Sequence, residues 1–335
     1  MQKSFFKITK RNCNLSFLFL IAKLMPVLGF FYACDEILEE NISNDSIITV
    51  SPKNNDLIIS NTVGFHWMEL EDADEYQIQI NNSQNIIMVD STVSTNHFNY
   101  PLIAGNYDWR VRGKNFAYQT SYTFPISFSV ESTFDLSNET VILNSPSPNT
   151  YFNYSENITF TWTAMPNSDS YTFELEKKPD NIVLFNQTGI TETLYLLDNN
   201  VIQEDAEFLW KIKALNDSTS TETLYSTRTF FIDRVLPNTP ILTSPEDEIF
   251  ILTNESIVFV WENGNDTGNI KSPIHSILQI ANDIGFNTIV EEFSISENNQ
   301  SHFFTETGEY YWRVKNLDAA GNSSSYSMTR KITVE

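Results

Sequence analysis

The sequence predicts an all-β protein built from three tandem β-sandwiches. Two observations support this fold class. The sequence repeats itself with a period of about 100 residues. Within each repeat, apolar residues alternate with polar ones, the period of two that is typical of half-buried strands. The composition agrees, because aromatic residues make up 13% of the 335 residues and only 10 residues are glycine. Such a chain has ample core material and is not collagen-like.

The first alternating strand predicted in each repeat carries a Phe-x-Trp motif. Each repeat opens with a Ser-Pro pair after a short aliphatic strand, and the tryptophan follows the proline by fifteen or sixteen residues. Because side chains two residues apart share one face of a strand, the Phe and Trp should both point into a core. The three motifs are Phe65-His66-Trp67, Phe160-Thr161-Trp162 and Phe259-Val260-Trp261.

A second and a third predicted strand follow in each repeat. The second begins with Tyr76 in the first copy and Tyr171 in the second, whereas the third copy has a longer loop and Ser276 at this position. The third strand reads aromatic-x-Trp-basic-aliphatic-basic, and a final strand ends each copy at 126–130, 229–232 and 331–334. We predict that all six tryptophans are structural core residues: Trp67, Trp109, Trp162, Trp210, Trp261 and Trp312.

These motifs resemble those of fibronectin type III modules, which are immunoglobulin-like β-sandwiches. The resemblance covers residues 47–335, and segment 316–322 is similar to the turn between strands F and G of that family. It implies that the Phe-x-Trp motif lies on strand B, the tyrosine on strand C and the later Trp on strand F. The predicted modules are 47–131, 139–234 and 238–335. Because the family has many functions, the resemblance predicts a fold and no chemistry.

The N-terminus is predicted to be a signal peptide of residues 1–33. It carries five basic residues and no acid, and its longest uninterrupted apolar run is too short to cross a bilayer. The segment before Cys34 resembles a bacterial lipobox, which implies that Cys34 is lipidated and becomes the mature N-terminus. Ordinary secretion with a free cysteine is the alternative. Residues 34–46 would then form an acidic tether, similar to the surface-export signal of Bacteroidetes lipoproteins, or simply a solvated spacer.

The charge of the chain excludes nucleic acid as a partner. The formal net charge is −23, and removal of residues 1–33 leaves 15 basic and 43 acidic residues, or −28. Binding to phosphates requires a basic surface, which such a chain lacks. The mature chain would hold Cys34 as its one cysteine, so no disulfide can form within it.

The sequence holds no pattern that indicates an enzyme, a cofactor or a metal site. It has no His-Glu-x-x-His, no Gly-x-Ser-x-Gly and no phosphate-binding glycine loop. Two acidic segments, 71–75 and 263–266, offer oxygen ligands for calcium, but neither matches a calcium-binding loop with alternating Asp and a terminal Glu. We therefore expect solvated loop residues there, and solvated histidines.

The outward residues of the predicted strands offer two further candidates. Basic residues alternate with core residues on the three Trp-containing F strands, where an anion-binding stripe is one interpretation. The structural interpretation is cross-strand pairing, in which Glu174 and Glu176 pair with Lys211 and Lys213. Exposed aromatic rings could instead stack on sugars. The aromatic candidates are Tyr151, Phe152, Tyr154 and Tyr311.

The sequence thus predicts a non-catalytic, lipid-anchored protein of the outer membrane, facing the cell exterior, with the periplasm as the alternative location. Its modules would bind a protein or act as a spacer, with the membrane contacted through the lipid on Cys34. The alternative is a glycan-binding lipoprotein, because the tandem modules resemble starch-binding proteins of polysaccharide-uptake systems. The partner, protein or polysaccharide, is not identified by the sequence.

Overall fold

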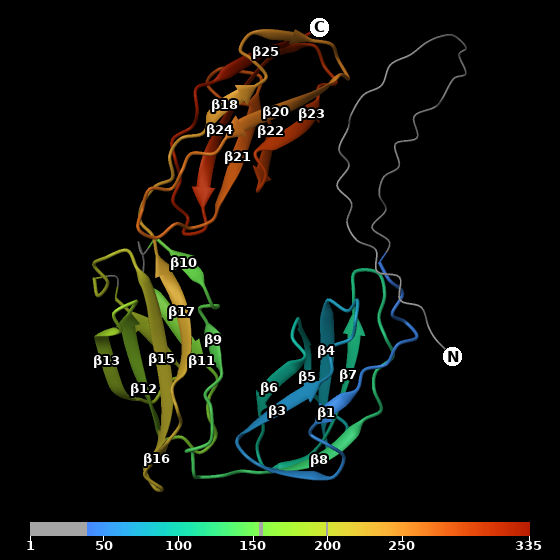
Figure 1. The fold of residues 1–335 in the computed structure, drawn as a ribbon, viewed down its shortest axis with the longest axis vertical. Helices are drawn as coiled ribbons and strands as arrows, with labels where there is room; N and C mark the ends of the chain where they lie inside the picture. The colour runs from blue at the N-terminus through green and yellow to red at the C-terminus, as the bar shows by residue number, and fades with distance from the viewer. Residues whose placement is uncertain (1–38, 154–156, 199) are drawn as a thin grey trace, which may run out of the picture. The chain divides into compact units, whose positions relative to one another are not determined.

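The computed structural model describes residues 39–153, 157–198 and 200–335. The predicted signal peptide, Cys34 and the first part of the predicted tether lie outside the described residues. The described part of the chain forms twenty-five strands and contains no helix that could cross a membrane. Figure 1 shows the strands in three groups, coloured blue to green, green to gold and orange to red. Each group is a β-sandwich, which confirms the predicted all-β fold class.

The first sandwich pairs a three-stranded sheet with a five-stranded sheet. The smaller sheet has the order β1-β3-β6, with β1 (Thr49–Ser51), β3 (Thr62–Trp67) and β6 (His97–Pro101). The larger sheet has the order β2-β8-β7-β4-β5, with β2 (Asp56–Ile59), β8 (Ile126–Glu131), β7 (Gly105–Lys114), β4 (Glu75–Asn82) and β5 (Ile87–Val93).

The second sandwich repeats this arrangement. Its smaller sheet has the order β14-β11-β9, with β9 (Leu143–Ser145), β11 (Ile158–Trp162) and β14 (Leu194–Leu197). The larger sheet has the order β10-β17-β15-β12-β13, with β10 (Thr150–Phe152), β17 (Ser226–Ile232), β15 (Glu207–Asn216), β12 (Ser170–Lys177) and β13 (Ile182–Ile190). A short strand, β16 (Thr221–Glu222), also pairs with β15.

The third sandwich has the same topology. Its smaller sheet has the order β18-β20-β23, with β18 (Ile241–Ser244), β20 (Ser256–Glu262) and β23 (Asn299–Phe303). The larger sheet has the order β19-β25-β24-β21-β22, with β19 (Ile249–Ile251), β25 (Arg330–Val334), β24 (Gly308–Asp318), β21 (Ile274–Ala281) and β22 (Ile289–Ile295).

The motifs occupy equivalent strands in all three sandwiches. The Phe-x-Trp motifs lie on β3, β11 and β20, and the later tryptophans lie on β7, β15 and β24. In chain order these are the third and the seventh strand of each sandwich, and they correspond to strands B and F. In each sandwich the strand after the Ser-Pro pair runs parallel to the final strand, and the pairs are β2–β8, β10–β17 and β19–β25.

Each sandwich has its own core, and two tryptophans lie in each core. All six indoles are at most 2% exposed. The Phe of the first motif packs against the later Trp in each case, with ring centroids 5.3, 5.0 and 4.8 Å apart in the three sandwiches. The third core differs because Ser276 replaces the tyrosine. There the Trp261 Nε1 group donates to Ser276 Oγ at 2.8 Å and to Asn263 Oδ1 at 3.0 Å.

Candidate functional site

The outward arginines of β7 and β24 already have partners on the neighbouring strand. In the first and third sandwiches each arginine donates two hydrogen bonds to one glutamine amide oxygen. These pairs, at 2.6 to 3.0 Å, are Arg110 with Gln79, Arg112 with Gln77 and Arg313 with Gln279. The glutamine oxygens therefore occupy guanidinium N–H groups that an anion would need for binding.

A tyrosine ring covers the same basic residues from outside. Tyr122 lies with its centroid 4.5 Å from both Arg110 and Arg112, Tyr225 lies 5.0 and 5.2 Å from Lys211 and Lys213, and Tyr326 lies 3.8 and 5.1 Å from Arg313 and Lys315. These are cation–π distances. The basic stripe is therefore part of the fold in all three sandwiches, and these contacts support the structural interpretation over an anion-binding one.

Lys211 forms the most enclosed ion pair of the second sandwich. Its ammonium group contacts both Glu174 and Glu176, and the three side chains are only 13–14% exposed. Burial alone would raise the pKa of Glu174, but hydrogen bonds from Lys211 and Asn186 outweigh burial and hold that pKa below its usual range. Burial alone would lower the pKa of Lys211, but the hydrogen bonds and charges of the two carboxylates outweigh burial and raise it. Both groups are thus charged at neutral pH.

The expected pairing of Lys213 with these two glutamates was wrong. Lys213 faces Thr172 in the register of β12 and β15, and its ammonium group bonds to Glu222 at 2.7 Å. Glu222 lies on β16, the short strand that pairs with the end of β15. The nearest carboxylate is therefore supplied by a strand that the sequence analysis did not assign.

Exposed aliphatic side chains gather on the same edge of each sandwich. The edge strands β5, β13 and β22 end the larger sheets, so one side of each has backbone groups without a neighbouring strand. At or just before the start of each strand lie apolar residues that are 38–58% exposed. Because each of these edge strands follows and pairs with the C-type strand, we call it the C′ strand. The C′-edge residues are Ile86, Ile87 and Met88; Ile182, Val183 and Leu184; Ile289 and Val290.

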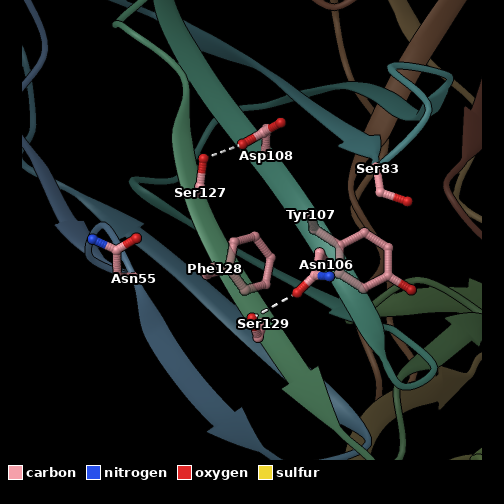
Figure 2. Close-up of a pocket in the computed structure, with 8 residues that line it drawn as sticks. All are labelled: Asn55, Ser83, Asn106, Tyr107, Asp108, Ser127, Phe128 and Ser129. Atoms are coloured by element: carbon pink, nitrogen blue, oxygen red, sulfur yellow. Dashed lines mark hydrogen bonds between the residues drawn. The ribbon is translucent and has the colours of Figure 1, made fainter.

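A shallow depression of about 320 Å³ lies on the first sandwich, over β7 and β8. Figure 2 shows that two polar pairs line it: Ser127 donates to Asp108, and Ser129 Oγ donates to Asn106 Oδ1 at 2.8 Å. The Tyr107 ring is 7% exposed, and its hydroxyl donates to the Ile103 carbonyl. This depression thus presents polar groups and no broad aromatic face.

A larger cavity of about 530 Å³ lies on the third sandwich, beside β22 and β23. Phe303 at its mouth is 60% exposed, and its ring lies nearly parallel to that of His302, with an angle of 16°. Glu291 and Glu306 also line it. Burial lowers the pKa of His302, against the opposing charge of Glu291, so the imidazole is neutral at neutral pH. The cavity combines an exposed ring with polar groups, as sugar sites do.

The aromatic candidates of the second sandwich are packed against the fold. Phe152 packs edge-on against Phe230 of the core, as strand packing predicts. Tyr151 stacks on Phe231, with ring centroids 4.7 Å apart, so one face of its ring is covered. Tyr154 lies outside the described residues. In the third sandwich the hydroxyl of Tyr311, which is partly buried, donates to Glu309 at 3.2 Å.

The two acidic segments differ. Among the described residues, one group of three carboxylates has oxygens within 4.8 Å of one another, and it includes Asp266 but no member of 71–75. The asparagines beside Asp266 are used elsewhere: Asn263 accepts from the Trp261 indole, and the Asn265 carbonyl accepts from the Asn238 N–H. Cys34, the predicted lipidation residue, lies outside the described residues.

Two sets of solved structures are similar to the chain at low sequence identity. The chain is similar to the FN1–FN3 domains of chicken CNTN1, with 14% identity, a TM-score of 0.46, and coverage of 87% of this chain and 98% of that one. It is also similar to fibronectin(III)-like modules of Clostridium thermocellum CbhA, with 14% identity, a TM-score of 0.41, and coverage of 58% and 94%. No family model and no curated protein matches the chain.

The strand orders define the class of protein. Each sandwich joins a B-type strand flanked by two partners to a sheet in which the final strand, the F-type strand and the C-type strand are neighbours. The chain is therefore a tandem of three fibronectin type III-like, immunoglobulin-like sandwiches.

Proposed function

We propose that the chain is a non-catalytic, lipid-anchored protein of the outer cell surface, whose sandwiches bind a partner protein through their C′ edges. One observation carries the proposal. Three equivalent edge strands, in three sandwiches of different sequence, all expose aliphatic side chains next to backbone groups that have no neighbouring strand. A spacer has no need of this feature, because exposed apolar edges promote unwanted association.

The chemistry of the C′ edge favours an extended polypeptide as the partner. A strand added to a sheet edge gains backbone hydrogen bonds, and side-chain contacts then provide specificity. The C′-edge residues supply such apolar contacts at the start of each strand. The predicted signal peptide and the acidic tether support a surface location, since lipidation at Cys34 would hold the three sandwiches outside the membrane.

We expect a triple variant of the C′ edge, Ile87→Asp, Val183→Asp and Val290→Asp, to lose its protein partner. Three new carboxylates would have to be desolvated on binding, so capture should fall by at least about tenfold. The measurement is chemical cross-linking of the full chain on intact cells, followed by quantitation of the captured protein. A Cys34→Ser version, which should leave the cells, reports whether capture needs the anchor.

The matched control places the same three charges on exposed apolar residues away from the C′ edges. Ile103→Asp, Leu224→Asp and Met328→Asp alter side chains that are 69%, 76% and 88% exposed, one in each sandwich. This control should capture the partner as the wild type does. Equal capture by both triple variants would refute binding through the C′ edges, and capture of no protein at all would leave the spacer role.

Glycan binding is a second candidate, and the cavity beside β22 and β23 favours it. If a sugar stacks on Phe303, Phe303→Ala should abolish retardation of the chain in polysaccharide-containing gels. Phe250→Ala is the control, because Phe250 is 69% exposed in the same sandwich and does not line the cavity. Retardation that is equal for Phe303→Ala and wild type would exclude this cavity as the sugar site.

A further inference from the structure

Three buried aspartates meet at one end of the third sandwich. Asp233 follows β17 directly, Asp266 lies in the loop between β20 and β21, and Asp318 is the last residue of β24. They are 0%, 8% and 2% exposed, and each offers a carboxylate oxygen within 4.8 Å of the others. Charged groups are rarely buried without a compensating charge, so this grouping requires a physical explanation.

Close backbone packing fixes the loop that carries Asp266. A Cβ atom at Gly264 would lie 2.0 Å from the carbonyl oxygen of Asn238, so only glycine fits there. The same Asn238 donates its N–H to the Asn265 carbonyl at 3.2 Å and accepts from the Asn316 side chain at 3.1 Å. The position of Asp266 is therefore set by the fold and is not that of a free surface loop.

The hydrogen bonds of the three carboxylates come from neutral donors and leave one oxygen without any. Asp233 accepts from the N–H and hydroxyl of Ser272, and Asp318 accepts from the N–H and amide of Asn322. Asp266 Oδ1 accepts from the Gly268 N–H, whereas Asp266 Oδ2 is buried and has no hydrogen-bond partner. Among the described residues, no basic side chain forms a salt bridge with any of the three.

The three buried carboxylates place an excess of negative charge at one point. Their oxygens lie within 4.8 Å of one another, and the residues are almost fully shielded from water. Like charges that share a site in this way disfavour ionisation unless a cation or a proton is present. The site therefore has to hold one or the other.

The other two sandwiches show what this position needs when no cation is involved. Asp318 stands six residues after Trp312, and the equivalent residues six after Trp109 and Trp210 are Asn115 and Asn216. The amide oxygens of both asparagines accept N–H groups of the following turn, at 2.8 and 2.9 Å. A neutral amide is thus sufficient to cap the turn. The third sandwich alone combines a carboxylate here with the longer loop that brings Asp266.

We propose that Asp233, Asp266 and Asp318 bind a calcium ion. Calcium takes six to eight oxygen ligands and accepts carboxylates, carbonyls and water in a flexible geometry, and the unpartnered Asp266 Oδ2 offers a ready ligand. Two positive charges would offset most of the three negative ones. The ion would tie Asp233, which ends the second sandwich, to the loops of the third. This inference is independent of the proposed protein-binding function.

The test is thermal unfolding of the full chain, with wild type and three variants measured in EDTA, in magnesium and in calcium. Calcium is used at about 10 mM, above the dissociation constants typical of extracellular modules. For wild type we expect the melting temperature of the third sandwich to rise by about 10 °C in calcium relative to EDTA. Hydrogen exchange of residues 264–272 and 316–322 assigns the transition, and terbium luminescence that calcium displaces reports binding directly.

The two aspartate variants should differ from wild type in melting temperature, both in EDTA and in their response to calcium. Asp266→Asn and Asp318→Asn keep hydrogen-bonding oxygens but remove charge, so they should melt above wild type in EDTA and lose the calcium response. Glu262→Gln removes one exposed charge from the same sandwich and should respond to calcium as wild type does. A wild-type chain with equal melting temperatures in EDTA and calcium, and no terbium luminescence, would overturn the proposal in favour of protonated carboxyls.

Discussion

Replacing Trp109 with alanine should unfold the first sandwich or lower its free energy of unfolding by about 3–5 kcal/mol. The indole is fully buried, and its centroid lies 5.3 Å from Phe65 and 6.4 Å from Trp67. Its Nε1 group also donates to the Pro52 carbonyl at 3.1 Å, which joins β7 to the Ser-Pro segment. Trp67→Ala should have a similar effect. The measurement is urea unfolding, with hydrogen exchange in β4 and β7 to identify the sandwich that melts.

The control for this prediction is Phe124→Ala. The Phe124 ring is 92% exposed, so its loss should change the free energy of unfolding by less than about 0.5 kcal/mol. The second and third sandwiches have separate cores and should keep their exchange protection in the Trp109 variant. Unchanged protection of β4 and β7 in Trp109→Ala would show that the core does not depend on this indole.

Lys211→Ala should destabilise the second sandwich by about 3 kcal/mol, the lower end of the range for broken buried ion pairs. The change leaves Glu174 and Glu176 close together, poorly hydrated and without their shared cation. The matched control is Lys177→Ala, because the partner of Lys177, Glu204, is 68% exposed and such pairs contribute about 0–1 kcal/mol. Equal free energies of unfolding for the two variants would contradict this account of the Lys211 pair.

The same pair predicts a pH dependence with a defined sign. The fold lowers the pKa of Glu174, so the pair stabilises the sandwich fully above the carboxyl pKa of the unfolded chain. That stabilisation is lost as the pH falls through the lower folded-state pKa. The difference between wild type and Lys211→Ala should therefore be largest near neutral pH and should shrink in acid.

Sequence patterns predicted the strands that are buried on one face. The strands with Phe-x-Trp and Trp-basic-aliphatic-basic alternate strictly, as the burial of β7 and β15 shows. The edge strands β5 and β13 were not predicted, because most of their residues are exposed and few are buried. An edge strand contacts the core only in part, so its sequence carries little periodic signal.

The candidate sites depended more on contacts between distant residues. Tyr122, Tyr225 and Tyr326 were missed as partners of the basic residues, since they follow the F-strand tryptophan at unequal distances in the sequence. The aspartate group was missed for a similar reason: Asp233, Asp266 and Asp318 belong to three segments that only the fold brings together. Spacing rules detect ligands within one loop, and this group follows none of them.

The parallel pairing of the strand after each Ser-Pro with the final strand has a mechanical consequence. When the start of β2 and the end of β8 are pulled apart, the force acts along both strands, and the same holds for β10 with β17 and β19 with β25. Because the two strands are parallel, the start of one and the end of the other lie at opposite ends of the pair. The pull therefore loads all the hydrogen bonds between them at the same time, instead of opening them one by one. The larger sheet of each sandwich is thus clamped against extension between these two strands.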